Sequence, residues 1–65
     1  MEKINQLKQI VKSHSFQEIE GMIVDVQTAN IILQVYEAIN EKNKEKFINQ
    51  SIDKMAHIAW QLVIR

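Results

Sequence analysis

The segment from residue 52 to residue 64 limits the possible folds of this chain most strongly, because it is apolar over far more than one helical face. At about 3.6 residues per turn, its apolar side chains span an arc of roughly 200°. One neighbouring helix covers about half of such an arc. The segment is therefore either the central element of the fold or part of a contact with another chain. The expected core stripe comprises Ile52, Met55, Ala56, Ala59, Leu62 and Val63, and Ile58 and Trp60 flank it.

Size and composition predict one globular helical domain over residues 1–65. Hydrophobic residues make up 46% of the chain, which is enough for a core and more than a disordered chain carries. A domain of this length buries only about 60% of the surface that its unfolded chain exposes, so we expect its stability to be marginal without reinforcement. The formal net charge is zero, which favours association over repulsion.

The sequence lacks the features of several classes of protein. The chain has no cysteine, which excludes disulfides and thiolate metal sites and is compatible with a reducing cytoplasm. No apolar run approaches the roughly 18 residues of a membrane span, and no secretory leader is recognisable. His14 and His57 lie far apart, and no phosphate-binding or metal-binding motif is present. We expect a cytoplasmic protein that is not an enzyme, with no cofactor, metal or membrane contact.

Apolar periodicity predicts an all-α fold, a small helical bundle of three main helices with one or two short ones. Asp25 or Thr28 is the predicted N-cap of the second main helix, Asn43 of a short helix, and Ser51 of the last helix. The main helices are expected at about 2–13, 26–42 and 51–64, and the short helical turns at 16–20 and 44–49.

The region around Gly21 has two interpretations. Ser15 and Glu18 form a capping-box pattern, and Gly21 stands where a left-handed helix cap would lie, which predicts a short helical turn. A β-hairpin that pivots on Glu20 and Gly21 is the alternative. We favour the turn, because the two-residue hairpin turns prefer Asn or Asp before Gly.

Five residues are candidates for contacts with a partner. Glu18 and Glu20 belong to an acidic stretch from residue 15 to residue 41 that contains no Lys or Arg. The stretch could dock a basic partner, although a solvated surface is the simpler interpretation. Tyr36, Ile58 and Trp60 lie on the two widest apolar helices, where such side chains complete a core or anchor an interface.

From Gly21 to residue 60 the chain resembles a group of very short, uncharacterised bacteriophage and prophage proteins. The resemblance rests on short runs in a fixed order, namely Val24-Asp25-Val26, Thr28-Ala29, Val35-Tyr36-Glu37-Ala38-Ile39-Asn40, Lys46-Phe47 and Met55-Ala56 with Ala59. It implies a phage origin and the cytoplasm of a bacterial host. It transfers no activity and no functional residue.

These observations together predict a non-enzymatic protein–protein interaction module. We expect a small phage-encoded adaptor or modulator that forms a homodimer, binds a host protein, or does both. The alternative is a helix-turn-helix DNA-binding protein built from the short helix near Lys44 and the last helix. The last helix offers only Lys54 and Arg65 as cations, so we expect no binding to nucleic acid.

Overall fold

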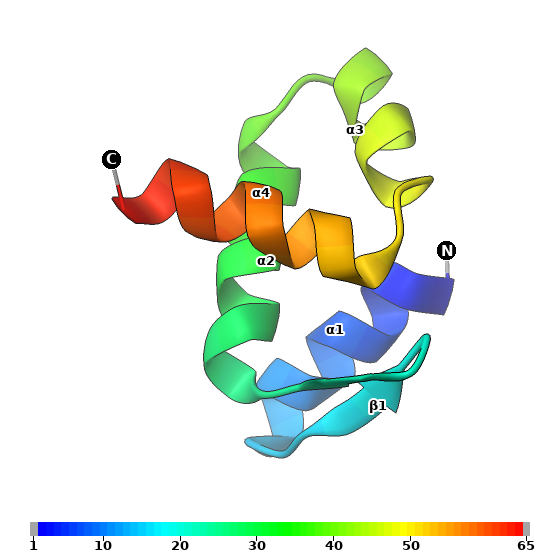
Figure 1. Ribbon diagram of the computed structural model, residues 1–65, viewed down its shortest axis with the longest axis vertical. Helices are drawn as coiled ribbons and strands as arrows, with labels where there is room; N and C mark the ends of the chain where they lie inside the picture. Colours follow the sequence, from blue (N-terminus) through cyan, green and yellow to red (C-terminus); the bar gives the residue numbers. More distant parts are fainter. Residues whose placement is uncertain (1, 65) are drawn as a thin grey trace.

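The computed structural model describes the backbone of residues 2–64 and the side chains of residues 3–63. It is mostly helical, as predicted, but it also contains one small antiparallel hairpin (Figure 1). The elements follow one another as α1 (Glu2–Ser13), β1 (Gln17–Ile19), β2 (Met22–Val24), α2 (Val26–Ala38), α3 (Glu41–Ile48) and α4 (Ile52–Ile64). None of the helices in the described part of the chain is both long and apolar enough to cross a membrane.

Helix α1 has the bounds that the sequence predicted, and it packs through one face. Ile4, Leu7 and Ile10 repeat at helical spacing and are all buried. The helix ends in a Schellman motif, with His14 in the left-handed conformation at a φ of 51°. The N–H of His14 donates to the carbonyl of Val11, and the N–H of Ser15 donates to the carbonyl of Ile10. This motif directs the chain back towards the helix as a strand.

The helical turn predicted for residues 16–20 is wrong, because this region forms the hairpin of β1 and β2. Glu18 pairs with Ile23 across the two strands, and Glu20 and Gly21 connect them. Both connecting residues have positive φ angles, 53° and 83°, as a type I′ turn requires. Glutamate is a poor residue for that conformation on local grounds. Its side chain is held by two contacts far along the chain, described below, and local sequence rules do not include these.

Helix α2 begins as predicted and ends earlier. The Asp25 carboxylate accepts a hydrogen bond from the N–H of Thr28 at 2.8 Å, so Asp25 is the N-cap. The helix was expected to reach residue 42, but it stops at Ala38 because Ile39 and Asn40 are extended. Asn40 then caps α3 by accepting from the N–H of Asn43 at 2.9 Å. The expected cap at Asn43 is therefore wrong, and α3 begins three residues earlier than predicted.

Helix α4 crosses α2 and completes the core (Figure 1). The Ser51 hydroxyl accepts from the N–H of Lys54 at 3.3 Å, in agreement with the predicted cap. The first part of the expected core stripe is buried, but Leu62 and Val63 are each 48% exposed. Figure 1 shows the reason, since the C-terminal end of α4 projects beyond α2. The buried stripe residues of α4 are Ile52, Met55, Ala56 and Ala59.

Candidate functional site

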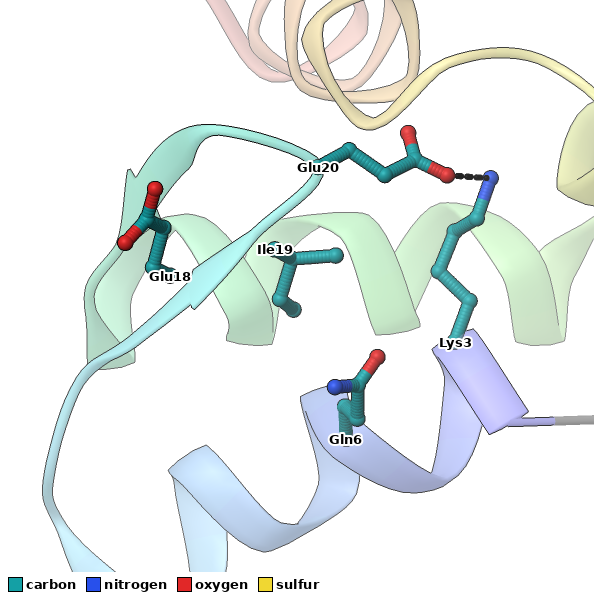
Figure 2. Close-up of a pocket in the computed structure, with 5 residues that line it drawn as sticks. All are labelled: Lys3, Gln6, Glu18, Ile19 and Glu20. Carbon is teal, nitrogen blue, oxygen red and sulfur yellow. Dashed lines mark ion pairs between the residues drawn. The ribbon is translucent and has the colours of Figure 1, made fainter.

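Charged side chains from segments distant in sequence converge beneath the hairpin turn (Figure 2). A hollow of about 290 Å³ lies there, between the start of α1 and the hairpin, and Lys3 and Glu20 face each other across it. Their Nζ and Oε2 atoms are 3.1 Å apart. Its lining comprises Lys3, Gln6, Glu18, Ile19 and Glu20.

The ammonium group of Lys3 makes contacts with three acceptors. Besides the Glu20 carboxylate, it donates to the backbone carbonyl of Ile48 at 3.2 Å and to that of Gln50 at 2.7 Å. An ammonium has three N–H donors, so these contacts use its full capacity. Both carbonyls belong to the end of α3 and the loop after it, where helical carbonyls lack intrahelical partners. Lys3 thus acts as a C-terminal cap for α3.

The Glu20 carboxylate is equally occupied. Its Oε1 atom accepts from the backbone N–H of Ile52 at 2.7 Å, at the first residue of α4. That hydrogen bond, followed by the contact with Lys3, lowers the pKa of Glu20. A carboxylate at a helix N-terminus is also favoured by the helix dipole. We call Lys3 and Glu20 the clasp, because the pair joins α1 and the hairpin to the turn between α3 and α4. These contacts give the Lys3 ammonium and the Glu20 carboxylate a structural role.

The acidic stretch does not assemble into one face. Figure 2 shows Glu18 pointing away from the clasp, whereas Glu20 points into it. Asp25 uses its carboxylate to cap α2. Glu37 lies near the other end of that helix, about 18 Å further along at 1.5 Å per residue. The four carboxylates that could have docked a basic partner are therefore divided between different structural roles and different ends of the molecule.

A second set of hollows lies between α2, α3 and α4. Two of them, of about 280 Å³ and 240 Å³, share Val35, Ile39 and Leu62 in their walls and so form one depression. We call this depression the α4 groove. Apolar side chains dominate its lining, which includes Val35, Ile39, Phe47, Ile58, Leu62 and Val63.

The exposed apolar side chains of α4 gather at this groove. Ile58 is 37% exposed, and Leu62 and Val63 exceed it. Large exposed apolar side chains that adjoin one another are typical of an interaction surface, whereas isolated ones are ordinary. Phe16 and Ile23, on and beside the hairpin, are also exposed but line none of these hollows. The groove is thus the described place where exposed apolar side chains line a hollow.

The predicted interaction candidates separate into three environments. Ile58 lines the groove. Tyr36 and Trp60 are half-buried and pack against the core. The ring of Tyr36 is also covered by Lys44, whose Nζ atom lies 5.1 Å from the ring centroid in a cation–π contact. Glu18 and Glu20 lie at the hairpin, so the structure does not bring the five candidates together.

Sequence reasoning missed most of the groove. Leu62 and Val63 were assigned to the core, and Val35, Ile39 and Phe47 were not among the predicted interaction candidates. The width of the apolar arc on the last helix was a usable signal, because it indicated more apolar surface than one neighbour can cover. Which part stays uncovered depends on where α4 crosses α2 (Figure 1), and helical periodicity does not specify that crossing.

The remaining candidate chemistry has ordinary structural explanations. His14 belongs to the end of α1, and His57 is exposed on α4. Among the described side chains, no three His, Asp or Glu residues are placed to hold a metal ion. Helices α3 and α4 follow each other as in a helix-turn-helix unit, but the outward side chains Asp53, Lys54, His57 and Gln61 include one cation. Arg65, the other cation considered, lies outside the described residues.

No protein-family model, curated protein or solved structure matches the chain.

Proposed function

We propose that this chain is a non-enzymatic protein–protein interaction module whose contact surface is the α4 groove. The observation that carries the proposal is the apolar end of α4, where Ile58, Leu62 and Val63 remain exposed beside a depression with an apolar lining. Burying a large aliphatic side chain contributes about 1.5–3 kcal/mol. Ile58, Leu62 and Val63 are already half-buried or more, so each gains only part of that amount, and together they form the apolar centre of a contact rather than the whole of it.

The charged groups of the clasp support a binding role over a catalytic one. A catalytic acid or base needs a free lone pair or proton directed at a substrate. Lys3 and Glu20 instead direct theirs at the helix ends and at each other. A phage-encoded adaptor or modulator of a host protein is the biological setting that the resemblance implies, and it belongs to this proposal.

Site-specific photo-cross-linking in bacterial cells tests the proposal. A photoreactive amino acid is placed at position 62 in the groove, and at position 23 in a matched variant. Leu62 and Ile23 are both aliphatic and well exposed, at 48% and 61%, so they differ mainly in location. We expect a discrete protein adduct from position 62, weakened by Ile58→Glu, and no comparable adduct from position 23. Equal labelling from both positions, or none from position 62, would contradict the proposal.

DNA binding provides an independent test. With zero net charge and one cation on the outward face of α4, few counterions are available for release on binding. We expect no gel shift of random duplex at about 150 mM salt. A shift at sub-micromolar protein that weakens steeply with salt would favour the helix-turn-helix alternative.

A further inference from the structure

We infer that the occupant of the α4 groove is a second copy of this chain, related by a two-fold axis that places Lys46 of each copy opposite Glu37 of the other. The inference rests on the proposed function and specifies its partner. It follows from the order of the hollows along the surface and from the charges at the two ends of that order.

The surface is a row of three adjoining hollows. The groove supplies the first two, one beside α3 and one between α2 and the end of α4. The second shares Gln34 and Ala38 with a third, shallower hollow on the outer face of α2. The residues that neighbouring hollows share define the order of the three hollows along the surface. The row therefore runs from α3, across the end of α4, to the outer face of α2.

The two ends of this row carry opposite charges. Lys46 is the charged residue that lines the hollow beside α3. Glu37 is the charged residue that lines the hollow on α2, and the central hollow has no charged lining. Both side chains belong to exposed residues. Within residues 3–63, the ion pairs of the chain involve other residues, so both charges are available to a partner.

A two-fold axis through the central hollow exchanges the two ends of the row. Such an axis makes an isologous contact, in which the same surface meets itself in the opposite direction. The cationic end of one copy then meets the anionic end of the other, twice per dimer. A parallel arrangement would instead oppose like charges. The charge pattern of the surface thus matches a second copy in one orientation.

The apolar centre matches the same arrangement. Leu62 and Val63 project at the end of α4 and also line the central hollow. Near the two-fold axis, Leu62 and Val63 of one copy contact Leu62 and Val63 of the other, beside the central hollows of the two copies. A polar rim around an apolar centre is the usual anatomy of a protein interface.

Sedimentation equilibrium with charge-reversed variants tests the arrangement. The natural chain should have a mass near twice 7.6 kDa at tens of micromolar. Lys46→Glu and Glu37→Lys should each weaken the dimer about tenfold or more, since each change opposes two like charges. Combining both changes restores opposite charges and should return the affinity to within about threefold of the natural value. Rescue by the combined variant is the result that supports the inference.

Matched controls separate a specific contact from a general charge effect. Lys8→Glu combined with Glu18→Lys makes the same two reversals at exposed residues outside the row, so it should leave the affinity unchanged. Far-UV circular dichroism of every variant verifies the fold. Leu62→Glu should abolish the dimer in a folded protein, because it places a charge in an apolar contact.

The outcomes distinguish this inference from the proposed function. A dimer that Leu62→Glu abolishes but that ignores both charge reversals overturns the arrangement and leaves the interaction module standing. A monomer at every concentration tested overturns the inference, and cross-linking from position 62 to a different protein then still supports the module. A monomer without any adduct from position 62 overturns both.

Discussion

The two ends of helix α4 differ in how their surfaces are used. At its start, the N–H of Ile52 is bound by the Glu20 carboxylate, which in turn pairs with Lys3. At its other end, Leu62 and Val63 are exposed beside a groove with an apolar lining. The first end is tied to the rest of the chain by charged groups. The second presents apolar groups that the chain itself does not cover.

The difference indicates which residues serve the fold and which are free to serve a partner. The clasp resembles a reaction centre in composition, since it gathers an amine and a carboxylate next to a hollow, yet its contacts end within the protein. The groove contains few chemically reactive groups. Covering its apolar surface with a partner would nevertheless be favourable, because it removes that surface from water. In so small a domain, the apolar surface of the groove is a substantial fraction of all the apolar surface that burial could use to stabilise the fold.

Large-to-small substitutions should give the greatest contrast between the two regions. Leu7→Ala, at a residue with 0% exposure, should destabilise the protein by about 2–5 kcal/mol, because it removes packing and leaves a cavity. Leu62→Ala should change the stability of the dilute protein by less than about 0.5 kcal/mol. Urea denaturation at low protein concentration measures both.

Ile10→Val provides a graded control for this comparison, with an expected loss of about 0.5–1.5 kcal/mol. It keeps the measurement within range if Leu7→Ala is largely unfolded. A loss of several kcal/mol from Leu62→Ala at dilution would place that side chain in the core and end the contrast between the two ends of α4.

Disrupting the clasp should cost less stability than the core substitution Leu7→Ala, and the loss of stability should depend on pH. The folded protein has a lowered pKa at Glu20, chiefly because the N–H of Ile52 binds the charged form. A lowered pKa in the folded state means that the contribution is complete above the unfolded pKa, about 4.3, and is lost as the pH falls further. Glu20→Gln should therefore lower the melting temperature near neutral pH, and the difference from the natural protein should shrink in acid.

Glu18→Gln is the matched control, since Glu18 lies on the same hairpin and points away from the clasp. It should have little effect at any pH. Melting temperatures at intervals from about pH 7 to about pH 3 make the comparison. A constant deficit for Glu20→Gln across this range would show that charge at Glu20 has no part in holding α4.

The clasp and the groove also mark how far the sequence could predict this molecule. Helical spacing predicted α1, most of α2 and α4, because these elements follow from periodic burial and nearby caps. The hairpin was predicted only as the alternative to a helical turn, because Glu20 adopts its left-handed conformation with support from Lys3 and Ile52, which are distant in sequence. The groove was missed for a related reason, since exposure at Leu62 depends on where α4 crosses α2. Both errors concern contacts between elements.

Substitutions at the N-cap of α2 should lower the stability less than the core substitution Leu7→Ala and change it more than substitution of His14. Asp25→Ala removes the N-cap of α2, which spans the molecule from the hairpin towards the groove, and should cost about 1 kcal/mol. Asp25→Asn keeps a capping oxygen and should cost less. The N–H of Thr28 lowers the pKa of Asp25, so its charge-dependent contribution should also fade below the usual range for aspartate. Equal losses from the Ala and Asn variants would mean that the charge, rather than the cap, carries the effect.

The smallest effect should come from His14, and its sign distinguishes it from Glu20. Both residues have positive φ angles, which cost a non-glycine residue about 1–2 kcal/mol. His14 is held there by backbone hydrogen bonds, which glycine can also make. After the loss of about 0.5–1 kcal/mol from the flexibility of glycine in the unfolded chain, His14→Gly should stabilise the protein by about 0.5 kcal/mol. Glu20→Gly relieves the same strain but removes the clasp, so we expect it to be destabilising near neutral pH. Thermal unfolding of the two variants at one pH measures the contrast, and a gain in stability from both would mean that the clasp contributes less than the strain it imposes.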